Sequence, residues 1–188
     1  MNKEKIITVF GSSRPTQQDT DYAEARTLGG ELGKRGFAVC SGGYGGVMEA
    51  VSRGAKEAGA RTYGVTADFF KREANRWIDV EIRKKTWEER LFELVELGDG
   101  FVACKGGTGT LVELAVVWEL VNKSVMPAKP FAVCGWFWQP ILERVREVEQ
   151  DQRPSSEPPR WGEATANLVK CAATPKDVAD YMASELNK

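Results

Sequence analysis

Two glycine-rich segments of this sequence share the spacing GGxGxxxE, and each could bind an anion. The first reads GGYGGVME from Gly42, and the second reads GGTGTLVE from Gly106. Each follows an apolar run and opens a helical pattern, so unpaired backbone amides and the positive end of the helix dipole favour negative charge there. The candidate phosphate-binding residues are Gly42, Gly43, Gly106, Gly107, Thr108, Gly109 and Thr110, together with Lys105 as an adjacent cation.

A third turn, Gly11-Ser12-Ser13, follows the first apolar run and adds hydroxyl groups to the candidate site. Any one of these turns could simply be a tight connection between a strand and a helix. Three of them at one edge of a sheet favour a phosphorylated small molecule as the ligand. No segment reads GxxxxGK[ST] or GxGxxG, which disfavours a P-loop ATPase and a standard dinucleotide dehydrogenase.

Two charged residues near these loops could act on a bound ligand. Glu113 ends the second glycine-rich segment, but the sequence TLVE at Thr110–Glu113 also fits a capping box, which taken alone favours a structural role. Arg90 falls in the first turn of a helix expected to begin after Thr86, where the helix dipole opposes a cation. Arg90 could pair locally with Glu93, yet an acidic ligand explains its position better.

Composition excludes several classes of function. The chain has 188 residues, 42% of them hydrophobic and 28% charged, which is typical of a soluble globular protein. Its 26 basic and 27 acidic residues give a net charge of -1, so broad binding to nucleic acid or to a membrane surface is not expected. The absence of histidine excludes Ser-His and Cys-His catalysis and histidine-based zinc sites, and we expect neither a metal nor a cofactor. With no signal peptide or spanning segment in the sequence, we expect a cytoplasmic protein.

Short β-branched and aromatic runs alternate with longer helical patterns along the chain. This alternation predicts one doubly wound, Rossmann-like α/β domain over residues 1–188, with a mostly parallel sheet and helices on both faces. A polar segment, Gln150–Arg160, is expected to be a surface loop. The predicted strands are Lys5–Phe10, Phe37–Cys40, Arg61–Val65, Ile78–Ile82, Gly100–Cys104, Phe131–Cys134 and Leu168–Cys171. The predicted helices are Asp19–Lys34, Gly46–Ala58, Trp87–Leu97, Leu111–Asn122, Gln139–Glu149 and Pro175–Leu186.

The helix after the second glycine-rich segment is apolar on almost every side. From Leu111 to Val121, nine of eleven residues are apolar. A sheet covers only one side of a helix, so this pattern predicts a homodimer in which the helix packs against its two-fold mate, with Trp118 in an otherwise exposed patch. The alternative is that the helix at Gln139–Glu149 covers it within one chain.

The sequence resembles the Lonely Guy family of phosphoribohydrolases, often labelled "possible lysine decarboxylases", from Ile6 to about Val145. KGGTGTLVE is similar to the family signature PGGxGTxxE, and Arg90 lies fifteen residues before Lys105, where the family has an arginine. Lys105, Leu91 and Val112 stand where the family has proline, lysine and glutamate. No segment resembles the lysine-containing pyridoxal phosphate motif that a lysine decarboxylase needs.

The resemblance implies hydrolysis of the N-glycosidic bond of a nucleoside 5′-monophosphate, either AMP or an N6-substituted, cytokinin-type AMP. The products are the free base and ribose 5-phosphate. It also implies that Arg90 and Glu113 are catalytic, that Gly106–Thr110 binds phosphate, and that the protein is a dimer. Some relatives with this fold carry the molybdenum cofactor without hydrolysis, so a carrier protein or a nucleotide sensor is the alternative. Phe69, Phe70 and Trp77 could stack on a flat ring of the ligand or pack under a loop.

Overall fold

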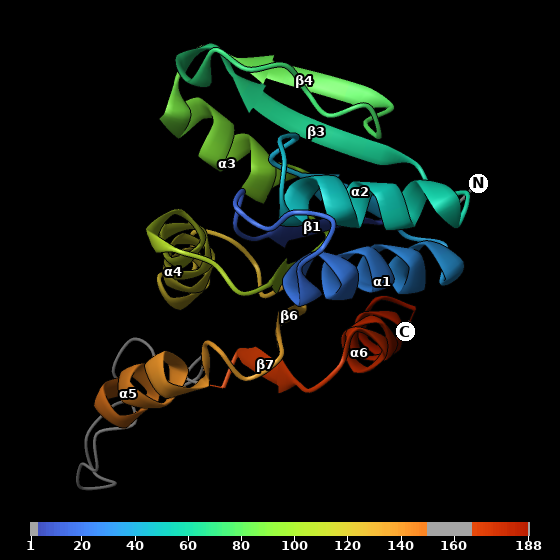
Figure 1. The fold of residues 1–188 in the computed structure, drawn as a ribbon. Coiled ribbons are helices and arrows are strands. Elements are labelled where there is room, and N and C mark those ends of the chain that lie inside the picture. The colour runs from blue at the N-terminus through green and yellow to red at the C-terminus, as the bar shows by residue number, and fades with distance from the viewer. Residues whose placement is uncertain (1–3, 150–166, 188) are drawn as a thin grey trace, which may run out of the picture.

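Seven parallel strands form one sheet in the order β4-β3-β2-β1-β5-β6-β7 in this computed structural model, which describes residues 4–149 and 167–187 (Figure 1). The strands are β1 (Ile6–Phe10), β2 (Ala38–Ser41), β3 (Thr62–Ala67), β4 (Val80–Lys84), β5 (Gly100–Ala103), β6 (Phe131–Cys134) and β7 (Val169–Ala172). The helices are α1 (Thr20–Lys34), α2 (Val47–Glu57), α3 (Trp87–Leu97), α4 (Thr108–Asn122), α5 (Gln139–Glu149) and α6 (Pro175–Leu186), with one 3₁₀ turn, η1 (Asp68–Phe70). The predicted doubly wound α/β fold is therefore confirmed, and Gln150–Arg160 lies outside the described residues.

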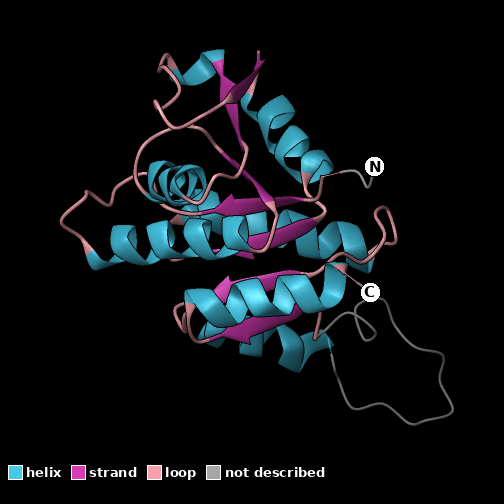
Figure 2. Cartoon of the chain, turned by 90° about the vertical axis from the view of Figure 1, so that its right-hand side faces the viewer, coloured by secondary structure: helices cyan, strands magenta, loops and turns pink. Residues whose placement is uncertain are grey.

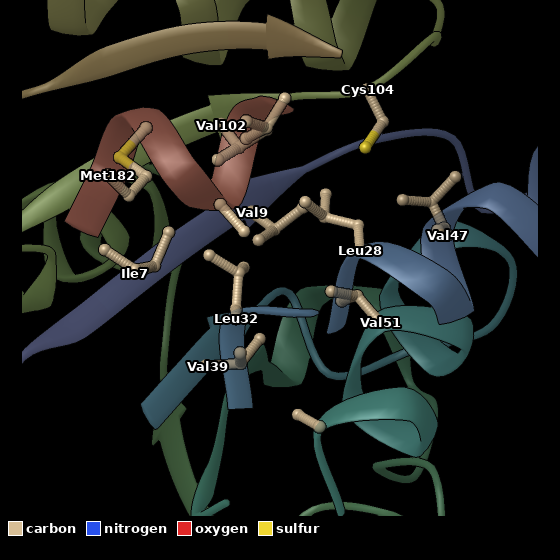
Figure 3. Packing of buried hydrophobic residues seen from close by; sticks show 14 of the residues in the cluster. Ile7, Val9, Leu28, Leu32, Val39, Val47, Val51, Val102, Cys104 and Met182 are labelled. Atoms are coloured by element: carbon tan, nitrogen blue, oxygen red, sulfur yellow. The ribbon is translucent and has the colours of Figure 1, made fainter. Parts of the chain in front are cut away.

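The helices form two layers, one on each face of the sheet. Figure 1 shows α1, α2 and α6 together on the right and α3, α4 and α5 on the left, and Figure 2 shows the first group in front of the strands. Strands covered on both faces need apolar side chains at nearly every position, which is the pattern of IITVF in β1, buried throughout. In Figure 3, Val9 of β1 and Val102 of β5 pack against Leu28 of α1.

The order in which strands are added to the sheet reverses after β4, because β5 returns to pair with β1. Strands β2 to β4 extend from β1 toward one edge, whereas β5 lies on the other side of β1 and pairs Ala103 with Phe10. Such a reversal leaves a crevice at the carboxyl ends of the two strands, because their connections leave toward opposite faces. Gly11 follows β1 and Cys104 follows β5, so the third turn and the second glycine-rich segment meet at this crevice.

Helix α4 differs from its prediction in two respects. It begins at Thr108, three positions before Leu111, with Gly107 as N-cap, so TLVE is not a capping box. Trp118 is only 4% exposed and packs with Leu114 and Val117 in the core between the sheet and helices α3, α4 and α5. The prediction that Trp118 lies in an exposed patch was therefore wrong. A helix that is apolar nearly all round gives no periodicity to show which side meets the sheet.

The predicted capping box at the start of α3 is present. Thr86 accepts a hydrogen bond from the backbone of Glu89, and the Glu89 carboxylate accepts one in return from the Thr86 N–H. Arg90 therefore does lie in the first turn of α3, as expected. Among the helices of residues 4–149 and 167–187, none is both long and apolar enough to cross a membrane.

Candidate ligand-binding site

A cavity of about 1030 Å³ opens at the crevice between the ends of β1 and β5. This volume is at the upper end of the range of small-molecule sites, roughly 300–1,000 Å³. Most of its lining comes from the loop after β1, the first turn of α1, and the segment from β5 into α4. Further lining residues come from the first glycine-rich segment, the chain after β3 and the start of α3. The predicted residues that line it are Gly11, Ser12, Ser13, Arg90, Lys105, Gly106, Gly107, Thr108, Gly109, Thr110 and Glu113.

The N-terminus of α4 presents its backbone amides to this cavity. The backbone N–H of Leu111 donates to the Gly107 carbonyl at 3.0 Å, so the amides of Thr108, Gly109 and Thr110 precede the first bond of the helix. These amides and the positive end of the helix dipole suit an anion such as phosphate. A Cβ at Gly106 would overlap the Thr110 side chain, so this glycine lets the loop fold against its own helix.

Gly109→Ala is expected to separate ligand binding from stability. A Cβ at Gly109 would meet no atom within 4 Å, so the fold accommodates alanine, which favours helix over glycine by about 0.5–1 kcal/mol. Gly109 lines the cavity beside the other α4 amides, so we expect the added methyl group to crowd a phosphate bound there. We expect an unchanged or raised melting temperature and phosphate-ligand affinity lowered by about tenfold, the effect of losing one or two charge-assisted hydrogen bonds. Thermal melting and calorimetric titration measure the two effects, and unchanged affinity would place the anion elsewhere.

The first glycine-rich segment has a different role from the second. Neither Gly42 nor Gly43 is among the residues that line the cavity. A Cβ at Gly42 would overlap the Arg90 guanidinium, so Gly42 provides the space through which that side chain passes. The N–H of Gly43 donates to the Ser41 hydroxyl at 3.2 Å. At the start of α2, the Val47 N–H donates to the Ser12 carbonyl at 2.8 Å, so this amide is already occupied.

The turn after β1 lies between the two glycine-rich segments. A Cβ at Gly11 would overlap the side chain of Val47, so this position requires glycine for close packing against α2. The Ser12 N–H donates to the carbonyl of Lys105 at 3.4 Å, which joins the turn to the loop before α4. Ser12 and Ser13 line the cavity beside the α4 amides. The Ser12 hydroxyl accepts a hydrogen bond from the Arg14 N–H at 3.1 Å.

Arg90 is buried beneath the cavity with only 6% of its surface exposed. Its Nε donates to the Val65 carbonyl at 2.8 Å, and its Nη1 lies 3.7 Å from Oε1 of Glu113. The guanidinium carbon is 5.6 Å from the ring centroids of both Tyr44 and Phe70. The alternative of a local pair with Glu93 is wrong, because that carboxylate pairs with Lys84 at 2.5 Å.

Glu113 is the second charged side chain beside Arg90 in the cavity, with 14% of its side-chain surface exposed. Burial raises the pKa of the Glu113 carboxyl to about 7, and the positive charge of Arg90 offsets part of that shift. A carboxyl group that titrates near neutral pH can accept or donate a proton under physiological conditions, which is what general acid–base catalysis requires. Glu113 thus lies one helical turn beyond the first amides of α4, with a carboxyl pKa suited to proton transfer.

The raised pKa predicts a specific pH dependence of stability. Because the folded-state pKa lies above the ordinary value of 4.5, the folded chain binds more protons than the unfolded chain between pH 4.5 and about 7. The Glu113 contribution to the free energy of unfolding therefore falls as pH rises through this window, by about 3 kcal/mol at 1.36 kcal/mol per pH unit. Denaturant unfolding of wild type and Glu113→Gln at pH 4.5 and 7.5 isolates the Glu113 contribution, since the other titratable groups are common to both proteins. The same change in the free energy of unfolding between the two pH values in both proteins would contradict the assignment.

Several lining residues were not singled out from the sequence. Asp21 in the first turn of α1 pairs with Lys105, Oδ2 to Nζ 3.0 Å, so the Lys105 cation beside the amides is partly neutralised. Arg14, Arg72 and Trp87 also line the cavity. The sequence shows Asp21 only as an acidic residue in the first turn of a predicted helix. Its pairing with Lys105, 84 residues away, arises only from the packing of α1 beside the crevice.

The three aromatic candidates are separated in the structure. Phe70 lines the cavity, whereas Phe69 is 68% exposed and is not among the lining residues. Trp77 lies away from the cavity, with the guanidinium carbons of Arg53 and Arg76 at 5.3 and 4.8 Å from its ring. Of the aromatic residues considered from the sequence, only Phe70 reaches the ligand space.

Comparison with known proteins identifies a matching family and a related archaeal protein. The model of the SLOG cluster4 family matches residues 4–155. A protein of Archaeoglobus fulgidus described as uncharacterized is 30% identical over 127 residues, which are 66% of this chain and 80% of that protein.

Solved structures that resemble nearly the whole chain include two molybdenum cofactor proteins. The molybdenum cofactor binding protein of the phototrophic bacterium Rippkaea orientalis has a TM-score of 0.75 at 24% identity, covering 98% of both chains. The molybdenum cofactor carrier protein of Chlamydomonas reinhardtii has a TM-score of 0.72 at 23% identity, covering 99% of this chain and 100% of that one. At these identities the similarity establishes the fold.

Proposed function

The chain belongs to the SLOG cluster4 family, and from this premise and the geometry of the cavity we propose that it is a phosphoribohydrolase. It cleaves the N-glycosidic bond of a nucleoside 5′-monophosphate, AMP or an N6-substituted AMP, with water. The products are the free base and ribose 5-phosphate. The resemblance of KGGTGTLVE to the Lonely Guy signature, with Arg90 upstream, supports this chemistry.

The observation that carries the proposal is the placement of Glu113 relative to the α4 amides. Thr110 and Glu113 are three residues apart on one helix, a rise of about 4.5 Å, and both line the cavity. A phosphate held at the helix N-terminus would therefore leave its attached ribose beside the Glu113 carboxylate. A largely covered carboxyl group at this point, with Arg90 at 3.7 Å, supports catalysis in addition to binding.

Cleavage of an N-glycosidic bond develops positive charge on the ribose ring. The ionised Glu113 carboxylate stabilises that charge and accepts a proton from the water that attacks the anomeric carbon. The bond from this carbon to the base nitrogen breaks, and the base leaves with its bonding electrons. It takes up the proton that Glu113 accepted, which returns the carboxylate to its ionised state. Arg90 holds Glu113 in place at 3.7 Å and adds positive charge beside the phosphorylated ligand. Every step uses side chains of this chain and water alone.

A carrier of a phosphorylated cofactor is the second candidate. Two proteins described as binding or carrying the molybdenum cofactor share the fold over nearly the whole chain. The cavity volume of about 1030 Å³ also has room for a ligand larger than a mononucleotide. A carrier would use the same α4 amides for the phosphate, and Lys105 would then contribute charge without catalysis.

Incubation of the purified protein with AMP, N6-substituted AMP and adenosine tests the proposal. We expect chromatography to show free base and ribose 5-phosphate from the monophosphates and none from adenosine, because the α4 amides bind the phosphate. No base release from any common nucleoside monophosphate, together with tight binding of a phosphorylated pterin, would replace the hydrolase with the carrier.

The same helix supports a homodimer, on a different face from that predicted. Ala115 is exposed, and Val112 and Val116 are half-buried, on the side of α4 opposite to Leu114 and Trp118. Residues 112, 115 and 116 share one face by helical spacing, which also carries Glu119 at its edge with Lys123, and the apolar part of this face favours an isologous contact. We expect sedimentation equilibrium at micromolar concentration to give twice the chain mass of 20.8 kDa, and Val116→Glu to halve it. A wild-type monomer would contradict the dimer.

A further inference from the structure

Phe70 presents an aromatic surface to the cavity. It follows β3 in the turn η1, lines the cavity, and keeps 36% of its surface exposed. Its ring contacts Tyr44 and Phe69 edge to face, with centroids 5.5 and 5.3 Å apart. Aromatic faces beside polar groups favour contact with a second flat ring.

The turn that carries Phe70 is held by residues distant in the sequence. The Tyr44 hydroxyl accepts a hydrogen bond from the Ala67 N–H at 2.9 Å and donates to the Ala67 carbonyl at 3.2 Å. The Asn75 amide donates to the carbonyls of Gly43 and Tyr44 at 3.0 and 2.9 Å, which fixes the chain that leaves the turn. An aromatic ring already fixed in place loses little entropy when a ligand stacks on it.

Short separations link the α4 amides, Glu113, Arg90 and Phe70 one to the next. The amides of residues 108–110 come first, and Glu113 lies one turn further along α4. Nη1 of Arg90 is 3.7 Å from Glu113, and the guanidinium carbon of Arg90 is 5.6 Å from the Phe70 ring. A nucleoside 5′-monophosphate has its phosphate, ribose and base in the same order.

We propose that Phe70 is the platform on which the ring of the ligand stacks, so that the site selects phosphorylated compounds that carry a planar heteroaromatic ring over simple sugar phosphates. This inference rests on the proposed function, because it extends the same ligand from the phosphate and ribose to the base. Phe70 acts on specificity, since it contacts the part of the ligand that does not react.

Calorimetric titration with AMP and with ribose 5-phosphate tests this assignment. All variants are made in a Glu113→Gln background, which prevents turnover during the titration. Phe70→Ala is expected to weaken AMP binding by about tenfold, the usual effect of losing one base–aromatic stack, and to change ribose 5-phosphate binding by less than about twofold. Phe70→Tyr keeps the ring and should retain AMP affinity. Phe92→Ala is the matched control, because Phe92 on α3 is 53% exposed and is not among the residues that line the cavity.

Two results would overturn the assignment. Equal weakening of both ligands by Phe70→Ala would mean that Phe70 acts by positioning Arg90 rather than by contacting a ring. A parent protein that binds AMP no more tightly than ribose 5-phosphate, or binds neither, would mean that the ring of the ligand gains nothing here. Failure of the proposed function is distinguishable, because wild-type protein would then bind AMP in preference to ribose 5-phosphate without releasing base.

Discussion

Glu113→Gln is expected to lower the turnover of a nucleoside 5′-monophosphate by about a hundredfold or more. The amide fills the same volume as the carboxyl group but can neither accept a proton from water nor stabilise positive charge on the ribose. At pH 5 the Glu113 carboxyl is largely protonated, so acid and amide should give similar stability there. Substrate binding should persist, because the α4 amides that we propose hold the phosphate are unchanged.

The matched control is Glu119→Gln on the same helix. Glu119 lies outside the cavity lining and pairs with Lys123 at 3.4 Å on the surface. The same chemical change there should leave kcat within about twofold, because an exposed pair contributes little. Steady-state kinetics by base release compare the two variants. Full activity in Glu113→Gln would return Glu113 to a structural role and remove the mechanism.

Arg90→Ala is expected to reduce kcat/KM by about a hundredfold or more, with a change in pH dependence as its signature. Arg90 holds the pKa of Glu113 below the value that burial alone would give, so its loss raises that pKa further. If the ionised carboxylate is the active form, activity rises with pH through this pKa. The midpoint of the residual activity should therefore move to higher pH in the variant.

Arg26→Ala is the control for Arg90→Ala. Arg26 pairs with Glu57 at 2.7 Å on the surface between α1 and α2, and it is not among the residues that line the cavity. Its removal should leave both kcat/KM and the pH midpoint unchanged. A pH profile of Arg90→Ala with an unshifted midpoint would contradict the coupling between Arg90 and Glu113.

Local sequence patterns predicted the helices and strands of this fold, but not which of the connecting loops line the cavity. The two glycine-rich segments have the same spacing, yet only the second lines the cavity with its glycines, whereas the first contributes Tyr44 and Met48. The difference is tertiary, since the first amide of α2 bonds to the Ser12 carbonyl and Gly42 accommodates the Arg90 side chain. Neither contact has a signature in the sequence around Gly42.

The start and the orientation of α4 were also beyond the sequence pattern. Thr108, Gly109 and Thr110 carry no apolar periodicity, and the N-cap is Gly107, which has no side chain to reveal a cap. The side of the helix that meets the sheet is set by packing of Trp118 and its neighbours. Arg90 and Glu113 could be identified as charged residues near the loops, whereas their contact at 3.7 Å depends on how α3 and α4 lie on the sheet.

The crystal structure of Glu113→Gln with bound AMP is the most direct test of the central claim, that one ligand reaches from the α4 amides to residue 113. We expect phosphate oxygens within about 3 Å of the backbone nitrogens of residues 108–110. The anomeric carbon of the ribose should lie beside the side chain of residue 113. A phosphate bound away from the N-terminus of α4, or a glycosidic bond directed away from residue 113, would contradict the proposed hydrolase.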